Sequence, residues 1–255
     1  MNIALYLKKE LVGTEIESNL KKKINEFGFF YDEDRPDVVI FVGGDGSFLR
    51  AVNKYLNRLD DIKFIGLNEG TLGFYSDFSV EKADEAFNAI KNNDYRLVST
   101  HLLEAKLHDK TIYAVNEIRL ENPFHTLISK VYIDNEYLET YRGNGLSVSS
   151  SFGSSAYNKS LGGAIVIPTI ETIQLSEIAP INNRVYRSIN SSIIVSKDQS
   201  ISLEGEFSEA VFGYDHLTIR EDVKRIDIKV SRKALHIIYR KGHSFVGQLK
   251  EAFLK

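Results

Sequence analysis

The stretch VVIFVGGDGSFLRAV, residues 38–52, constrains the fold more than any other part of the chain. Five apolar residues in a row are typical of a strand that is buried on both faces, as in a parallel sheet. Gly43, Gly44 and Gly46 then surround Asp45, and a helical pattern begins at once. Such a turn brings backbone N–H groups and the positive end of a helix close to an anion. The stretch predicts a strand–loop–helix unit that can bind phosphate.

The glycine loop differs from two common phosphate-binding motifs. A P-loop needs a lysine after its glycines, and the dinucleotide fingerprint would need glycine where this chain has Leu49. The carboxylate of Asp45 suits proton abstraction from a hydroxyl, or coordination of a divalent cation beside phosphates. Both uses belong to phosphoryl transfer. The alternative is a plain tight turn in which Asp45 only favours the positive helix end.

The first third of the chain alternates between strand and helix patterns. Strands are predicted at 3–7, 38–42 and 62–67, and helices at 15–27, 47–59 and 80–93. This order predicts a parallel sheet with helices on its faces. We therefore expect an α/β, Rossmann-like domain over residues 1–96.

The character of the chain changes after residue 96. Segments that alternate with period two are separated by turn signals such as Asp109-Lys110 and Asp134-Asn135, which predicts antiparallel strands. We expect an all-β, sandwich-like domain over 97–243. Residues 244–255 return to helical spacing, and we expect this helix to pack back on the first domain.

Composition excludes several classes of protein. The chain has 255 residues, of which 43% are hydrophobic, and its net charge of -3 argues against bulk nucleic-acid binding. The absence of cysteine excludes a disulfide framework and a thiolate metal site. The sequence has neither an apolar run long enough to span a bilayer nor a secretory signal. We expect a cytoplasmic protein without nucleic-acid or membrane partners.

A second group of candidate residues lies between 114 and 163. The stretch 143–163 is rich in serine and glycine, with Tyr157 as an aromatic face for a base and Arg142 and Lys159 as cations for phosphates. Taken alone, such a loop is more often a flexible connector. In AVNEIRL, residues 114–120, Asn116 and Glu117 could bind ribose hydroxyls or a base edge, or could simply mark a turn or an exposed edge.

Together these stretches resemble the blocks of the NAD kinase family, in its order and at its spacing. The similar blocks are GGDGSFLRA, NEGTLGFYSDF, AVNEIRL, and GLSVSSSFGSSAYNKSLGGAIVIP with QLSEIAPINNRVYR. They cover most of residues 38–220 and look closest to the bacterial, Gram-positive type. Phosphofructokinases and lipid kinases also carry Gly-Gly-Asp-Gly, whereas the Ser-Ala-Tyr block with its Asn-Lys-Ser continuation is more specific.

The resemblance implies phosphorylation of the 2′-hydroxyl on the adenosine ribose of NAD, which gives NADP. ATP or polyphosphate would be the phosphoryl donor, with Mg²⁺ or another divalent cation. The resemblance also implies an α/β domain joined to a β-sandwich-like domain, and a homodimer or homotetramer.

The family's functional positions can be carried over residue by residue. Asp45 matches the catalytic proton acceptor, and Gly43, Gly44 and Gly46 form the phosphate loop. His216 matches a histidine that approaches the phosphates. The resemblance implies that NAD is bound by Asp45, Gly46, Arg50, Phe74, Tyr75, Asn116, Glu117, Arg142, Asn144, Ser155, Ala156, Tyr157, Asn158, Lys159, Ser160, Ala179 and His216.

Two departures keep rival hypotheses open. The family usually has Asp-Gly where this chain has Asn144-Gly145, and Thr-Pro-Thr/Ser-Gly where it has residues 150–153, Ser-Ser-Phe-Gly. Losing that proline removes a fixed φ and frees an N–H group. One rival is a nucleotide-binding regulator that has lost catalysis. A second rival, which rests on the shared loop motif, is a different Gly-Gly-Asp-Gly kinase that acts on a sugar phosphate or a lipid. The Asn-Glu and Ser-Ala-Tyr blocks argue against it.

Overall fold

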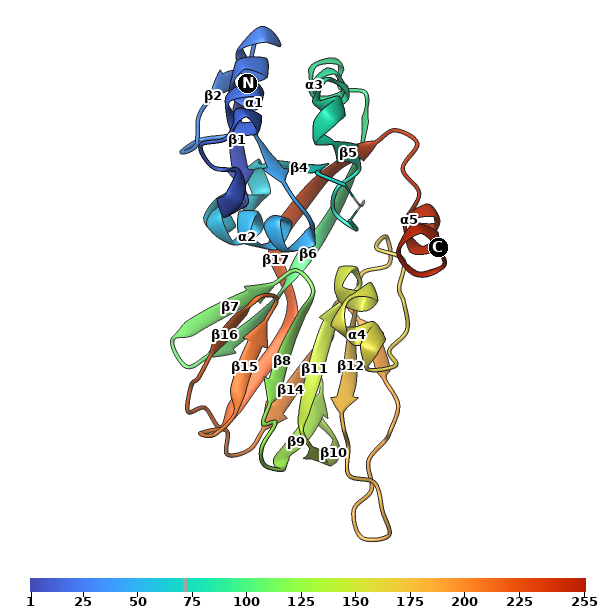
Figure 1. Ribbon diagram of the computed structural model, residues 1–255. Coiled ribbons are helices and arrows are strands. Elements are labelled where there is room, and N and C mark those ends of the chain that lie inside the picture. The colour runs from blue at the N-terminus through green and yellow to red at the C-terminus, as the bar shows by residue number, and fades with distance from the viewer. Residues whose placement is uncertain (71–72) are drawn as a thin grey trace. The chain divides into compact units, whose positions relative to one another are not determined.

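Two long strands carry the chain from one structural unit to the other and back (Figure 1). The computed structural model describes residues 1–70 and 73–255. Unit 1 comprises Met1–Ser99 and Ala234–Lys255, and unit 2 comprises Thr100–Lys233. The sequence placed the boundaries at 96/97 and 243/244. Because β6 (Tyr95–Leu107) and β17 (Arg225–Arg240) run through both crossings, no turn marks either of them.

Unit 1 is built on a parallel sheet. Its strands are β1 (Asn2–Leu7), β2 (Phe30–Tyr31), β3 (Val38–Val42), β4 (Lys63–Asn68) and β5 (Phe78–Ser79). The order is β2-β1-β3-β4, with both β5 and the end of β17 paired to β4. All these pairs are parallel, as the strand–helix alternation predicted.

Helices cover both faces of this sheet (Figure 1). They are α1 (Glu15–Glu26), α2 (Asp45–Lys54) and α3 (Ala83–Asn92). On one face, the core that includes Ile40 and Val42 also contains residues of α1 and α3. On the other face, Phe48 of α2 packs against Phe41 and Phe64. The buried run of β3 is therefore explained by packing on both sides.

The helix predicted at 47–59 is shorter than expected. It begins two residues earlier, at Asp45, and gives way after Lys54 to a 3₁₀ turn, Leu56–Asp61. The apolar stripe nevertheless continues, because Leu59 of that turn is buried. The other 3₁₀ turns described in unit 1 are Lys9–Leu11 and Val80–Lys82, and unit 2 has one at Phe152–Ser155.

The C-terminal helix α5 (Phe245–Phe253) belongs to unit 1. The ring of Phe74 lies 6.4 Å from that of Phe245 and 5.8 Å from that of Phe253. Burial of α5 is slight, since none of its residues is fully buried.

Unit 2 consists of two antiparallel sheets. The first has the order β13-β12-β11-β8-β15-β16. Its strands are β8 (Glu117–Glu121), β11 (Gly145–Ser150), β12 (Thr172–Ile178), β13 (Ile193–Ser196), β15 (Val211–Tyr214) and β16 (Leu217–Ile219). The second sheet contains β6, β7 (Lys110–Ala114), β9 (Leu127–Ile133), β10 (Glu136–Gly143), β14 (Ser200–Glu204) and the first half of β17.

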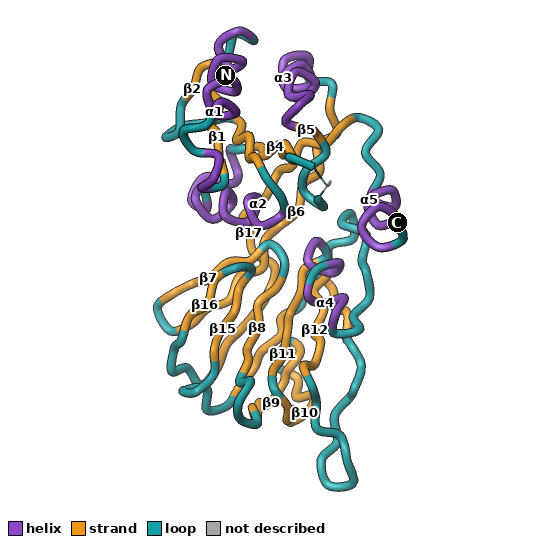
Figure 2. The backbone as a smooth tube through the Cα atoms, viewed as in Figure 1, coloured by secondary structure: helices purple, strands orange, loops and turns teal. Residues whose placement is uncertain are grey.

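Residues from both sheets form one core in unit 2. Val148 and Leu120 come from the first sheet, and Val131, Leu203 and Ile226 from the second. Figure 2 shows that strands dominate unit 2, with α4 (Tyr157–Ser160) as a short helix. The sandwich expected from the period-two pattern is therefore present.

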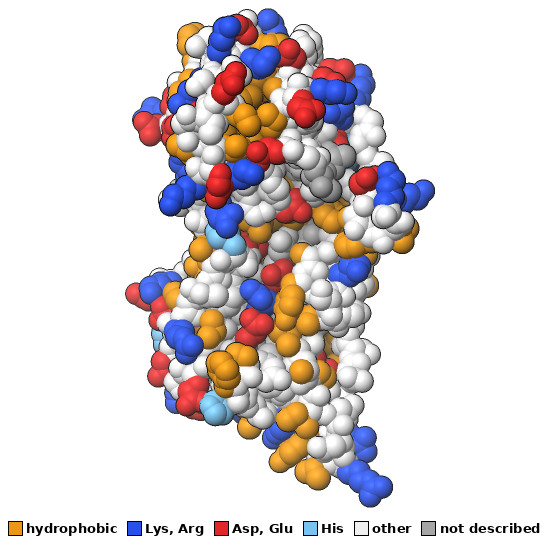
Figure 3. Space-filling view, viewed as in Figure 1, with side chains coloured by type: hydrophobic (Ala, Val, Ile, Leu, Met, Phe, Trp, Pro, Cys, Tyr) orange, Lys and Arg blue, Asp and Glu red, His pale blue; other side chains and the backbone are white. Residues whose placement is uncertain are grey.

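The surface agrees with the near-neutral composition. Charged side chains of both signs are interspersed over the face that Figure 3 shows. Among the described residues, no helix is both long enough and apolar enough to cross a bilayer.

We predict that Tyr141→Phe destabilises unit 2. The buried Tyr141 hydroxyl donates to the Ile178 carbonyl at 2.6 Å and accepts from the Gly145 N–H at 3.0 Å. Phenylalanine removes the hydroxyl partner of the buried Gly145 N–H and one of the two donors to the Ile178 carbonyl, which keeps the Asn144 N–H at 3.0 Å. The loss costs about 1–3 kcal/mol of unfolding free energy. Urea denaturation followed by circular dichroism measures the change. Tyr137→Phe is the control, because Tyr137 is exposed and its loss should cost less than about 0.5 kcal/mol. Equal midpoints for Tyr141→Phe and the unmodified protein would contradict the prediction.

Candidate active site

The glycine loop joins the buried end of β3 to the first turn of α2. Gly43 has φ of +130°, and a Cβ there would lie 2.4 Å from the Ser47 hydroxyl oxygen. Only glycine therefore fits this position without strain. Gly44 is the N-cap of α2, and its carbonyl accepts from the N–H groups of Ser47 and Phe48 at 2.9 and 3.3 Å. Asp45 thus stands at the positive end of the helix.

The Asp45 carboxylate is half-buried and is held by backbone donors. The Tyr75 N–H donates to Oδ1 of Asp45 at 3.2 Å. Burial raises the pKa of Asp45, while the N–H groups of Phe74 and Tyr75 lower it. Gly73 permits this close approach, because a Cβ at Gly73 would lie 2.4 Å from Oδ1 of Asp45. The result is a carboxylate of fixed orientation that is more basic than a free aspartate.

Three neighbouring predicted residues lie around Asp45 in unit 1. Tyr75 is buried, and its ring stacks on Phe48 at 4.2 Å, so it approaches Asp45 through its backbone. Phe74 contacts α5 with its ring. Arg50 is exposed and donates to the Gly46 carbonyl at 3.1 Å, across one turn of α2.

In unit 2, Asn116 and Glu117 are buried where β7 leads into β8. The Asp215 carboxylate holds this turn: it accepts from the N–H groups of Val115 at 2.8 Å and Asn116 at 2.7 Å. The Asp215 N–H donates back to the Glu117 carbonyl at 3.2 Å. His216 follows Asp215 in the exposed turn between β15 and β16.

The carboxyl groups of Glu117 and Asp215 have raised pKa values. Burial, and then the charge of Asp215, raises the pKa of Glu117 to about 7. Burial raises the pKa of Asp215 to about 6, against the opposing effect of its backbone donors. Oε2 of Glu117 is buried and has no hydrogen-bond partner among the described residues. A buried carboxyl group of this kind is characteristic of functional sites.

Arg119 organises the same face of β8. Its guanidinium lies 3.6 Å from Glu117 and 3.5 Å from Glu121, and 5.0 Å from the centre of the Tyr157 ring. A side chain at position 213 would collide with it, since a Cβ on Gly213 would lie 2.9 Å from an Arg119 nitrogen. Arg119 therefore links the Asn116–Glu117 turn to the aromatic face of Tyr157.

The serine- and glycine-rich block is an ordered part of unit 2. The Ser150 hydroxyl donates to the Val115 carbonyl at 2.5 Å and accepts from the Gly153 N–H at 3.0 Å. A Cβ on Gly153 would lie 2.0 Å from the Asn116 carbonyl oxygen, so this glycine lets the block lie against the Asn116 turn. The reading of this stretch as a flexible connector is therefore wrong.

Residues of this block differ in exposure. Ser155, Ala156 and Tyr157 are partly exposed, and Lys159 and Ser160 are exposed. Asn158, by contrast, is fully buried: it accepts from the Ser176 hydroxyl at 2.8 Å and donates to the Ser154 carbonyl at 3.3 Å. Its side chain fixes the block from inside.

Comparison with known proteins identifies this arrangement. Residues 9–95 match the ATP-NAD kinase N-terminal domain, and residues 115–239 match the ATP-NAD kinase C-terminal domain. The chain is 36% identical over 262 residues to NAD kinase 1 of Bacillus cereus (strain ZK / E33L), which covers 100% of this chain and 99% of that protein. The chain belongs to the NAD kinase family. It is also 35% identical over 263 residues to NAD kinase 1 of Oceanobacillus iheyensis, covering 100% of this chain and 98% of that protein.

Two solved structures share the fold. Yeast NADH kinase complexed with NADH gives a TM-score of 0.86 at 18% identity, over 99% of this chain and 87% of that one. An NAD kinase from Archaeoglobus fulgidus in complex with ATP gives 0.81 at 20% identity, over 98% and 99%. The expected fold class, an α/β part followed by a β-rich part, is confirmed.

At Asn144, where the NAD kinase family usually has aspartate, the side-chain amide donates a hydrogen bond that a carboxylate could not donate. The Asn144 side-chain nitrogen donates to the Asn122 carbonyl at 3.1 Å, and the Asn122 N–H donates to the Asn144 carbonyl at 2.8 Å. Nearby, the Arg142 guanidinium lies 4.5 Å from the centre of the Tyr186 ring. Ala179, at φ of +48°, is exposed just beyond β12.

At the second departure, Ser151 keeps a backbone angle that proline would have. Its φ is −60°, within the range that a proline ring fixes. Its hydroxyl accepts from the Thr172 N–H at 3.0 Å and donates to the Ile170 carbonyl. Side-chain hydrogen bonds thus replace the missing ring as the constraint on this loop.

Asp215 and Arg119 were missed by the reasoning from sequence. The signal for Arg119 was present, because Glu117, Arg119 and Glu121 alternate along a strand and so share one face. Asp215 directly precedes His216, the residue that the family resemblance singled out. Its importance depends on a contact with residues about one hundred positions away, which a local pattern does not reveal.

We predict that Glu117→Gln changes how stability depends on pH. The pKa of Glu117 is raised in the folded state, so the folded protein binds the proton more tightly and its stability falls as pH rises from about 4.5 to about 7. Glutamine removes this loss. The variant should gain about 1–3 kcal/mol relative to the unmodified protein between pH 5 and pH 8.

Urea denaturation of the ligand-free protein across this pH range measures the effect. Glu136→Gln is the matched control, because Glu136 is exposed at the start of β10. If the unfolding free energies of Glu117→Gln and the unmodified protein changed in parallel with pH, ionisation of Glu117 would not destabilise the folded protein, and the prediction would be wrong.

Proposed function

We propose that this protein phosphorylates the 2′-hydroxyl on the adenosine ribose of NAD, with ATP as phosphoryl donor, and so makes NADP. The observation that carries the proposal is the Asp45 carboxylate, held by the Tyr75 N–H at the start of α2 in a chain of the NAD kinase family. Polyphosphate is proposed as an alternative phosphoryl donor to ATP. We expect the enzyme to act in the cytoplasm.

Asp45 is proposed to accept the proton of the 2′-hydroxyl while that oxygen attacks the terminal phosphoryl group. A free aspartate is a weak base at neutral pH, and partial burial moves the pKa of Asp45 upward. The N–H groups of Phe74 and Tyr75 oppose this rise and orient the carboxylate. The backbone of Gly43, Gly44 and Gly46 approaches the phosphates.

Residues of unit 2 are proposed to bind and orient NAD. Asn116 and Glu117 contact the ribose and the base, and Tyr157 offers its ring to a base. The other proposed contacts come from Arg50, Phe74 and Tyr75 in unit 1 and from Arg142, Asn144, Ser155, Ala156, Lys159, Ser160, Ala179 and His216 in unit 2. Asn158 is proposed to act indirectly, because its side chain is buried beneath this block.

A divalent cation such as Mg²⁺ fits the proposed site only when donor phosphates supply most of its ligands. The described residues include no group of three or more histidines and acids that could hold a metal. Mg²⁺ bound with phosphates commonly uses one or two protein carboxylates and water. When bound, such a cation would neutralise charge on the phosphates.

Association of copies into a homodimer or homotetramer is also proposed. Unit 2 exposes large apolar side chains on two loops and an edge strand. They are Ile165, Ile167, Ile170, Val185, Tyr186, Ile189 and Ile194. A concentration of exposed apolar groups of this kind is typical of a protein–protein contact.

Asp45→Asn tests the proposed reaction. An assay with protein, Mg²⁺, NAD and either ATP or polyphosphate measures NADP formation. Asparagine cannot accept the proton, so turnover should fall by about 10²–10⁴-fold while NAD affinity stays within a few-fold. Unchanged turnover would exclude Asp45 as the base. Calorimetric binding of NAD without NADP formation by the unmodified protein would identify an inactive regulator instead.

Val185→Asp tests the proposed association. Val185 is 77% exposed, and a charge there should weaken an apolar contact between copies. Size-exclusion chromatography with light scattering should show a lower mass for the variant. Val12→Asp, at a 62% exposed valine of unit 1, is the control and should leave the mass unchanged. A monomeric unmodified protein would contradict the proposal.

A further inference from the structure

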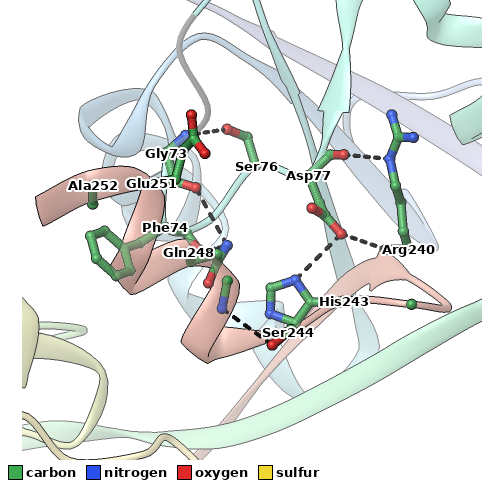
Figure 4. A pocket seen from close by; sticks show the side chains of 12 residues that line it. Gly73, Phe74, Ser76, Asp77, Arg240, His243, Ser244, Gln248, Glu251 and Ala252 are labelled. Carbon is green, nitrogen blue, oxygen red and sulfur yellow. Dashed lines mark hydrogen bonds and ion pairs between the residues drawn. The ribbon is translucent and has the colours of Figure 1, made fainter. Parts of the chain in front are cut away.

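Two side chains hold the carbonyl oxygen of Phe74. The Tyr239 hydroxyl donates to it at 3.0 Å, and the side-chain amide of Gln248 donates to it at 3.1 Å. The same Gln248 nitrogen lies 3.4 Å from the Gly73 carbonyl oxygen. Figure 4 shows Gln248 reaching from α5 toward this segment. The peptide that leads into Tyr75 is therefore tied to both β17 and the C-terminal helix.

The other end of this short segment is also fastened to the end of β17. The Asp77 carboxylate accepts from the Arg240 N–H at 2.9 Å and lies 3.3 Å from Nδ1 of His243. The Arg240 side chain donates to the Asp77 carbonyl at 2.6 Å. Burial disfavours the charge of Asp77, but His243 and Arg240 hold its pKa below its ordinary value.

The Phe74 carbonyl belongs to the same peptide group as the Tyr75 N–H, which orients Asp45. The N–H groups of Phe74 and Tyr75 donate to the Asp45 carboxylate, and the Phe74 carbonyl accepts from Gln248. A peptide plane is rigid, so the Phe74 carbonyl and the Tyr75 N–H that share one plane must move together. Any shift of the Phe74 carbonyl therefore changes the hydrogen bond to Asp45.

We propose that α5 is a positioning element for phosphoryl transfer, and that Gln248 is the positioning residue through which it fixes the backbone donors of Asp45. This inference rests on the proposed function. Gln248 touches neither substrate nor the reacting atoms in this scheme. It acts through the Phe74–Tyr75 peptide.

The weak attachment of α5 makes this contact decisive. No residue of α5 is fully buried, and a cavity of about 390 Å³ is lined by α5 together with Gly73, Phe74, Ser76 and Asp77. Close packing therefore does not hold the helix against the segment along its whole length. Phe74 is held to α5 by ring contacts with Phe245 and Phe253 and by the Gln248 hydrogen bond.

The charged and polar groups around Asp45 determine how its pKa should change when the Phe74–Tyr75 backbone is loosened. From β17, the buried phenol of Tyr239 faces Asp45, and its pKa is raised by burial and then by the charges of Asp45 and Asp77. Asp77 itself is paired with His243 and Arg240. The backbone donors of Phe74 and Tyr75 are the groups that lower the pKa of Asp45, so loosening them should raise that pKa further.

The experiment compares Gln248→Met with Lys250→Met. Methionine has nearly the length of glutamine but no amide, and Lys250 is an exposed residue on the same helix. We expect kcat of Gln248→Met to fall about three- to tenfold, the effect of weakening one hydrogen bond, with KM for NAD and ATP within about twofold. The acidic limb of the kcat–pH profile should move to higher pH, because the ionised Asp45 is lost at higher pH. Lys250→Met should match the unmodified enzyme in kcat and in the position of the acidic limb.

A second readout does not depend on the reaction. Carbon-13 NMR of labelled aspartate carboxyl groups, with the Asp45 signal identified by its loss in Asp45→Asn, gives the pKa of Asp45 directly. That pKa should rise in Gln248→Met and in Tyr239→Phe, which removes the other donor to the Phe74 carbonyl. If the unmodified protein forms no NADP, the proposed function fails, while this titration still tests the role of α5.

Three outcomes would overturn the inference. The first is an unchanged Asp45 titration in both variants. The second is a loss of kcat in Gln248→Met without any movement of the acidic limb. The third is an equal loss in Lys250→Met, which would mean that α5 matters only for folding. Circular dichroism melting confirms that each variant is folded before the comparison is made.

Discussion

The contact between Asp45 and the backbone at Phe74–Tyr75 depends on several features of unit 1. It needs glycine at position 43 to turn the chain into α2, and glycine at position 73 to bring the second segment close. It also needs the parallel pairing of β3 with β4, because these two strands carry the two segments to the same edge of the sheet. One hydrogen-bonded carboxylate thus depends on strand order, turn chemistry and a close backbone approach at once.

Unit 2 contains two acids, Glu117 and Asp215, whose ionisation is disfavoured by burial. Burial raises the pKa of both, and the charge of Asp215 raises that of Glu117 further. Each acid is partly compensated by a nearby group. Backbone N–H groups stabilise Asp215, while Arg119 lies beside Glu117. A core designed only for stability would replace such charges by apolar residues. Their retention beside the aromatic ring of Tyr157 fits a surface shaped to bind a polar ligand.

Much of the fold could be predicted from the sequence because its signals are local. The continuous apolar run of β3 and the helical stripe of α2 indicate a strand buried on both faces, and the alternation after residue 96 indicates a sandwich. The family resemblance supplied Asp45 and the Asn116–Glu117 pair. Neither signal could reveal that Asp215 holds the Asn116 turn or that Gln248 holds the Phe74 carbonyl. Those contacts join segments that are far apart in the chain, and their donors and acceptors are common residue types.

The two departures from the family pattern show how the chain preserves backbone geometry when side chains change. Ser151 keeps a φ of −60° without proline and uses its hydroxyl to hold the neighbouring strand. Asn144 uses its amide to donate to the Asn122 carbonyl, a contact unavailable to an aspartate. At both positions the side chain stabilises the local backbone directly. The shape of these loops therefore does not require the residue that the family usually has, so their altered sequence is compatible with an intact binding surface.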